Sequence, residues 1–288
     1  MNQKTIISVS RRTDIPAHYM DWFARRLKSG YALARNPLNK NQSRQVSLLP
    51  EDVSCLVFWS KDPTPLLSRL DILTPYAYYL HNTVNAYGSG LEPGLPPLAK
   101  RLDTFRRLAD ALGAERMLWR YDPILYSPEH GADFHAESFA HIAGTLRGYT
   151  QRITVSFLDM YAKIEKPARA LSLRRPHDSE ARLLLPMLAA IARQNGLSIQ
   201  ACAEADDYAS LGVSRARCID PLLIARITGE PVSLTKDKNQ RPACGCAPSV
   251  DIGAYHTCPH GCVYCYANSS LRRALVSYAQ HDPGTPSL

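Results

Sequence analysis

Residues 98–121 read LAKRLDTFRRLADALGAERMLWRY and contain one helix followed by one strand. Apolar residues recur at helical spacing as far as Gly113, and glycine is a residue type that commonly ends a helix. The run RMLWRY at 116–121 is short, apolar and aromatic, which favours a buried β-strand. The stretch therefore predicts a helix over 98–113 and a strand over 116–121.

The same alternation extends from residue 1 to about residue 205. Further strands are predicted at 5–10, 55–60, 76–83, 152–158 and 197–204, and further helices at 16–30, 137–149 and 179–196. Pro186 predicts a kink or break in the last helix. Residues 31–48 interrupt the alternation and are predicted to form a hairpin or an inserted loop.

Strands that alternate with helices indicate βαβ units and a parallel sheet. Six or more such units favour an α/β fold built as a partial or closed (β/α) barrel of the TIM type, with a doubly wound open sheet as the alternative. We expect residues 1–217 to form this core. Residues 218–288 are expected to form a cysteine-rich arm packed on it as part of one structural unit.

The composition excludes some classes of protein. Of the 288 residues 45% are apolar and 21% charged, and no run approaches the roughly 18 to 20 apolar residues of a membrane helix. The first residues are too polar for a secretory signal, so we expect a cytoplasmic protein without membrane contact. The net charge of +8 includes no basic run, so it supports an anionic small-molecule substrate as well as it supports nucleic acid.

Five of the eight cysteines lie in residues 244–270, CGCAPSVDIGAYHTCPHGCVYCYANSS. In a cytoplasmic chain such clustering indicates metal binding or catalysis rather than disulfides. Cys258, Cys262 and Cys265 are spaced so that one tight loop can bring three thiolates to a [4Fe-4S] cluster and leave one iron without a protein ligand. A zinc site that also uses His256 or His260 is the main alternative for this loop.

The remaining cysteines fall into two kinds. Four of them are predicted to ligate a second iron–sulfur cluster or Zn²⁺, namely Cys202, Cys218, Cys244 and Cys246. Cys55 lies in an apolar strand pattern and is predicted to be a buried packing residue.

The loop Cys258-x3-Cys262-x-Tyr264-Cys265 resembles the cluster loop of radical S-adenosylmethionine enzymes. The resemblance implies that S-adenosylmethionine chelates the open iron, with Tyr264 near the adenine, and that a 5′-deoxyadenosyl radical acts on a small-molecule substrate. It also implies an electron donor such as flavodoxin or ferredoxin. In those enzymes the cysteine loop usually follows the first strand, where this chain has residues 10–14. A Gly-Gly-Glu segment usually follows their second strand, where this chain has residues 60–62.

Two further resemblances bear on function. The string CVYCYAN at 262–268 is similar to the branch that contains spore photoproduct lyase, which suggests nucleic-acid repair as a third hypothesis. A second hypothesis is a non-catalytic iron–sulfur or zinc-binding protein with a structural tail. The segments SRRTDIP, FWSKDP, KDKNQRPACGC and DIGAYHTC resemble a bacterial domain-of-unknown-function family.

Polar and ionisable residues follow the predicted strands, where a parallel barrel would build its site. The candidate catalytic residues are Arg11, Arg12, Asp62, Arg120, Asp122 and Glu204. The arginine guanidinium binds carboxylates and phosphates in a bidentate way. We expect at least one of these arginines to pair with a nearby carboxylate. Glu204 lies two residues after Cys202, so we predict that it faces the same side of a strand and lies near the cofactor.

Overall fold

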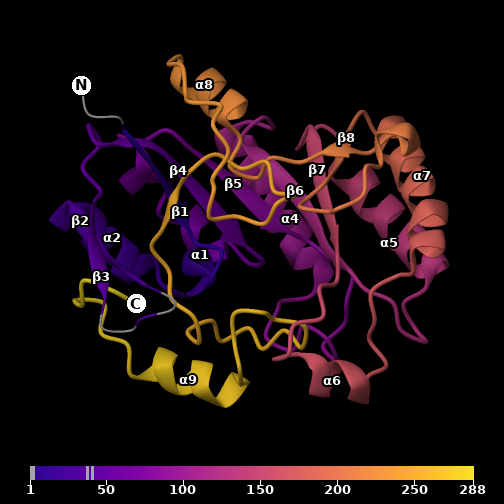
Figure 1. The fold of residues 1–288 in the computed structure, drawn as a ribbon. Coiled ribbons are helices and arrows are strands. Elements are labelled where there is room, and N and C mark those ends of the chain that lie inside the picture. The colour runs from indigo at the N-terminus through magenta and orange to yellow at the C-terminus, as the bar shows by residue number, and fades with distance from the viewer. Residues whose placement is uncertain (1–3, 37–38, 40–41) are drawn as a thin grey trace.

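The computed structural model describes residues 4–36, 39 and 42–288 and is built around an eight-stranded sheet in which all the neighbouring strands run parallel (Figure 1). The strands are β1 (Thr5–Val9), β4 (Val53–Ser60), β5 (Tyr78–Thr83), β6 (Met117–Ile124), β7 (Arg152–Phe157), β8 (Ser198–Ala201), β9 (Ser214–Arg215) and β10 (Val250–Asp251). Their order in the sheet is β10-β1-β4-β5-β6-β7-β8-β9. The predicted α/β fold with a parallel sheet is therefore confirmed.

The sheet is open rather than a closed barrel. From β1 to β9 its strands follow one another in chain order, as barrel strands do, but β9 and β10 remain edges, and within the described residues no strand pair joins them. Both edge strands are only two residues long, and the neighbouring β8 has four. Such short strands offer few backbone groups for the pairing that would close a barrel.

The helices lie close to where the sequence predicts them. The helical elements are α1 (Ile15–His18), α2 (Met20–Ser29), α3 (Thr64–Leu67), η1 (Leu70–Leu73), α4 (Leu98–Leu112), α5 (Ala132–Thr145), α6 (Glu165–Ala170), α7 (Asp178–Gln194), η2 (Ala209–Leu211), α8 (Pro221–Thr228) and α9 (Leu271–Ala279). Helix α7 continues through Pro186 without a break. Strands β2 (Tyr31–Arg35) and β3 (Ser43–Ser47) pair antiparallel, which confirms the hairpin alternative for residues 31–48.

The two faces of the sheet pack against different parts of the chain. One face carries Phe58 and Trp119 into the main core, where they meet residues of α2, α4, α5 and α7. On the other face Cys55, Val57 and their neighbours pack against Ile219 and α8. Alternate residues of β4 point to opposite faces, and both faces are buried because residues 218–247 cover the side that lacks the long helices. Cys55 is fully buried, as predicted.

The arm enters the sheet through β10. The carboxylate of Asp251 accepts hydrogen bonds from Ser8 Oγ and Ser10 Oγ, both at 2.6 Å, and from the backbone N–H groups of Arg11 at 2.8 Å and Gly253 at 3.0 Å. At Gly253 a Cβ atom would lie 2.1 Å from Ser10 Oγ, so only glycine fits this approach. The arm therefore leaves the sheet at the carboxyl end of β1, and Figure 1 shows it continuing beside α6 to α9.

No helix in the described part of the chain combines the length and the apolar character required to cross a bilayer.

Replacing Asp251 tests this attachment. Asp251→Ala would leave four donors without their acceptor, so we expect it to lower the free energy of unfolding by about 3 kcal/mol. Asp103→Ala, which removes only an exposed i,i+4 pair with Arg107, should cost about 0.5 kcal/mol or less. Urea denaturation measures both values, and equal losses in the two variants would contradict the assignment.

Candidate metal centre

The cysteine loop is docked against the segment that follows β5. The N–H of Gly94 donates to His260 O at 2.9 Å, and the N–H of Val263 donates to Leu91 O at 3.0 Å. At Gly94 a Cβ would lie 2.4 Å from His260 O, so this close contact also requires glycine. The loop is therefore held by backbone contacts at the carboxyl edge of the sheet.

Cys258, Cys262 and Cys265 all lie in this loop, and all three are free, partly exposed cysteines. Burial raises the pKa of each thiol, that of Cys258 to about 12, and a charge on Cys265 raises the pKa of the other two further. Three partly exposed cysteines within electrostatic range of one another suit a bound cation, because metal ligation removes the thiol protons. In chemical type, the three thiols match the ligands of the iron–sulfur cluster implied by the sequence.

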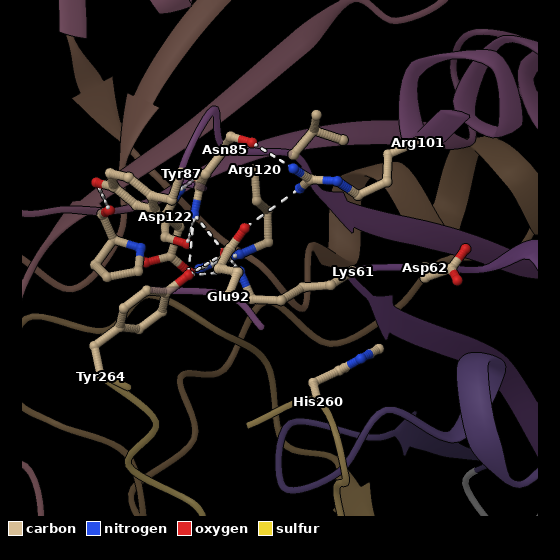
Figure 2. Close-up of polar contacts among 12 residues, drawn as sticks. Lys61, Asp62, Asn85, Tyr87, Glu92, Arg101, Arg120, Asp122, His260 and Tyr264 are labelled. Carbon is tan, nitrogen blue, oxygen red and sulfur yellow. Dashed lines mark hydrogen bonds and ion pairs between the residues drawn. The ribbon is translucent and has the colours of Figure 1, made fainter. Parts of the chain in front are cut away.

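A buried ionic network borders the loop, and Figure 2 shows Lys61, Glu92 and Tyr264 pointing toward one another. Glu92 is 2% exposed. Its carboxylate binds Lys61 Nζ at 2.8 Å and Arg101 at 3.4 Å, and it accepts a hydrogen bond from Tyr264. Lys61 also lies 3.0 Å from the Tyr264 hydroxyl and counteracts the effect of burial on the pKa of Cys262.

Asn85 extends the network to β6. Its side chain donates to Asp122 O at 2.8 Å and accepts from the Asp122 N–H at 2.9 Å. Asp122 in turn forms an ion pair with Arg120 at 2.7 Å, which is the kind of pairing expected from the sequence. Arg120 also donates to Cys218 Sγ at 2.9 Å. A chain of polar contacts therefore joins the cysteine loop to the second group of cysteines.

A histidine pair flanks Cys258. Ligand atoms of His18, Cys258 and His260 lie within 4.8 Å of one another and form a group that could hold a metal ion. His260 Nε2 lies 2.9 Å from Asp14 Oδ2, and its Nδ1 lies 3.3 Å from His18 Nε2. Burial opposes ionisation of Asp14, yet His260 lowers the pKa of Asp14 to about 2.

The other predicted site residues have local partners. Arg11 and Arg12 lie 3.8 and 4.0 Å from the carboxylate of Asp251. Asp62 accepts a hydrogen bond from Thr64 at 2.5 Å and lies apart from the ionic network (Figure 2).

Glu204 is held beside β7 and the segment between α6 and α7. Its carboxylate accepts from the Phe157 N–H at 2.9 Å and pairs with Arg175. Of the predicted catalytic residues, the structure brings Arg120 and Asp122 into one network with Tyr264. It gives Glu204 partners outside that network.

A cavity of about 940 Å³ opens beside the loop. Its lining includes Arg12, Lys163 and Arg273 together with the rings of Tyr255 and Tyr266, and no aspartate or glutamate is among the described residues that line it. Tyr266 follows Cys265 directly, so the cavity borders the cysteine loop. Such a lining suits an anionic ligand with a flat apolar part.

Sequence reasoning missed several residues of the site, including His18, Asn85 and Glu92. Glu92 is the single charged residue of the Pro/Gly-rich connection LEPGLPP at 91–97, and that isolation is a signal that could have singled it out. His18 carries no such signal, because its contact with His260 joins positions 242 residues apart. His256 instead accepts a hydrogen bond from the Ser269 N–H at 2.9 Å.

Removing Glu92 tests the buried network. Glu92→Ala would leave the buried Arg101 and the partly exposed Lys61 without their counter-ion, and we expect it to lower the free energy of unfolding by about 3 kcal/mol. The matched control is Glu115→Ala, which breaks an exposed pair with Arg226 and should cost about 1 kcal/mol or less. Chemical denaturation gives both numbers. A small loss for Glu92→Ala would show that the network is solvated.

Comparison with known proteins identifies the family. A family model described as Domain of unknown function (DUF1848) matches residues 6–267, a span that includes all eight cysteines. This match confirms the resemblance to a domain-of-unknown-function family. A search of curated proteins returned no match. The chain belongs to the DUF1848 family.

Proposed function

We propose that this chain is an iron–sulfur protein in which Cys258, Cys262 and Cys265 hold a [4Fe-4S] cluster, and that it is an enzyme of the radical S-adenosylmethionine type. The observation that carries the proposal is the placement of three free cysteines in one tight loop at the carboxyl edge of a parallel sheet, within electrostatic range of one another. Three thiolates leave one iron of a cubane without a protein ligand, and such an iron can bind a small molecule.

The position of the loop in the fold supports this assignment. In the sequence the loop lies at the wrong end of the chain for such an enzyme, but β10 pairs in parallel with β1 and directs the arm to the carboxyl end of β1. Spatially, the arm thus reaches the edge at which a loop after the first strand would lie. The order of segments along the chain therefore does not exclude the function.

The neighbouring residues suit a bound cofactor. Lys61 supplies positive charge beside Cys262, which favours an anionic thiolate cluster. Tyr264 is fixed by Glu92 and Lys61, and its ring faces the Lys61 ammonium at 5.3 Å. When cluster and S-adenosylmethionine are bound, one electron from a donor such as flavodoxin or ferredoxin would yield methionine and a 5′-deoxyadenosyl radical that takes hydrogen from the substrate.

The cavity beside the loop is the proposed substrate site. Its cationic and aromatic lining suits an anionic small molecule. The loop and the sheet edge would keep water from the reacting atoms, which protects a reactive intermediate.

Cluster content tests the first part of the proposal. Protein purified without oxygen should contain about four irons and four sulfides for this site, and Cys262→Ala should lose them because two thiolates cannot hold the cubane. Cys55→Ala is the matched control, since it removes a fully buried cysteine of the strand β4 and should keep the full content. Iron and sulfide analysis decides, and an unchanged cluster in Cys262→Ala would contradict the assignment.

Catalytic type needs a separate measurement. Reduced protein given S-adenosylmethionine should form 5′-deoxyadenosine, and Cys262→Ala should form at least about a hundredfold less because it lacks the open iron. Chromatography of the products measures both. If the protein contains the cluster but forms no 5′-deoxyadenosine, it is an iron–sulfur protein and the proposed radical activity is contradicted.

A zinc-binding protein is the second candidate, and the group formed by His18, Cys258 and His260 favours it. Two imidazoles and a thiolate are ordinary ligands of Zn²⁺. Under this candidate His18→Ala should remove about one zinc per chain while Cys265→Ala keeps it. Under the cluster proposal the effects reverse, since Cys265→Ala loses iron and His18→Ala retains it. Metal analysis of these two variants separates the candidates.

A further inference from the structure

We propose that Cys202, Cys218, Cys244 and Cys246 form a second metal centre, closed by four thiolates and independent of the loop at residues 258–265. Its occupant is a thiophilic centre, either a single Zn²⁺ ion or an iron–sulfur cluster. The proposal does not depend on the function of the first site. The close contact between Cys202 and Cys218, continued through Cys246 to Cys244, carries it.

The four cysteines come from three separate segments. Cys202 follows β8, Cys218 precedes α8, and Cys244 and Cys246 lie in the loop before β10. The sulfur atoms of Cys202 and Cys218 lie 3.2 Å apart. The thiol of Cys246 lies close enough to Cys218 and Cys244 that both raise its pKa. Positions as far apart as 202 and 246 therefore meet in one continuous group of thiols.

Packing alone does not account for this group. Cys55 lies in the same buried cluster and shows how a packing cysteine behaves, because among the described residues its thiol forms one hydrogen bond, to the carbonyl of the next residue at 3.6 Å. A disulfide does not account for it either, since a sulfur–sulfur bond measures about 2.05 Å and all four cysteines are free. Four cysteines gathered at one place, all of them free, match the ligand set of a metal.

The surroundings favour thiolates. The guanidinium of Arg120 donates to Cys218 Sγ at 2.9 Å, and the Ile219 N–H donates to Cys246 Sγ at 3.3 Å. N–H donors and a buried cation stabilise the negative charge of a metal bound by four thiolates, and such donors tune metal–thiolate centres. Arg120 is itself 7% exposed, so its charge acts in a region that excludes water.

The sulfur contacts bear on the occupant. Four thiolates around Zn²⁺, each about 2.3 Å from the ion, are about 3.8 Å apart. Cys202 and Cys218 lie 3.2 Å apart, but in the described part of the chain no three of the four sulfurs lie within 4.8 Å of one another, so a single ion would have to draw the ends of the row together. An iron–sulfur cluster requires the sulfurs to be spread further apart. In both cases all four ligands come from the protein, so no coordination position is left for substrate.

This centre would hold in place residues 218–247, which cover the face of the sheet that lacks the long helices. Residues 218–247 pack against Cys55, Val57 and Tyr79 with little regular structure apart from α8. A metal bound by four thiolates would tie both ends of this segment to β8. The fold then depends on the metal, because a site absent from the unfolded chain adds its binding free energy to folding.

The test separates this centre from the first one. The triple variant Cys258→Ala/Cys262→Ala/Cys265→Ala removes the loop cysteines, and zinc, iron and sulfide are then measured per chain in protein purified without oxygen. We expect about one zinc without sulfide if a single ion is bound, or iron with an equal amount of sulfide if a cluster is bound. Either result supports a centre closed by four thiolates. The absence of metal from a folded triple variant would overturn the proposal.

Two further variants make the result specific. Adding Cys218→Ser/Cys246→Ser to the triple variant should remove the remaining metal, and adding Cys55→Ala should leave it in place. Metal that persists after the loss of Cys218 and Cys246 would overturn the proposal.

A second measurement serves if the variant without Cys218 and Cys246 fails to fold. Treating the triple variant with a chelator should lower its unfolding temperature by several degrees, and returning the metal should restore it. An unfolding temperature that does not respond to the chelator, while metal analysis shows the metal to be gone, would contradict a structural centre.

Discussion

The carboxylate of Asp251 is the contact on which the rest of the arrangement depends. It accepts hydrogen bonds from Ser8, Ser10 and the Arg11 backbone and so holds the short strand β10 in register beside β1. Two residues of strand pairing would be weak alone, because a short edge strand gains few backbone hydrogen bonds. The buried charge-assisted bonds fix the direction of the arm, and that direction brings the cysteine loop to the carboxyl edge of the sheet.

Burial of charge is the second constraint. Glu92 lies between Lys61 and Arg101, and Asp122 lies against Arg120. Glu92, Arg101 and Arg120 are buried, while Lys61 and Asp122 are partly exposed. Such pairs are retained at a desolvation penalty, so they contribute little net stability compared with apolar packing. These pairs do fix the positions of their side chains, because a buried charge that loses its partner is strongly unfavourable. The network thereby holds Tyr264 and its loop in one position, which is what a site for a charged cofactor requires.

Local patterns in the sequence were enough to predict most strands and helices, since α4 and β6 follow from the spacing of apolar residues within a few positions. The spacing of Cys258, Cys262 and Cys265 likewise identified the loop. Glu92 and His18 were missed because their roles come from contacts between distant segments. The open sheet was equally beyond a local pattern, since closure depends on whether edge strands as short as β9 and β10 can pair.

The two groups of cysteines differ in how much of the fold they require. The loop thiols lie within eight residues, from Cys258 to Cys265, so a metal can gather them before the rest of the chain is in place. The other four come from three segments and meet only after β8, α8 and the loop before β10 have packed. Binding of a metal by the second group would therefore require the complete fold. Because Arg120, Asp122 and Asn85 connect this group to Tyr264, a metal bound by the second group would also influence the surroundings of the first.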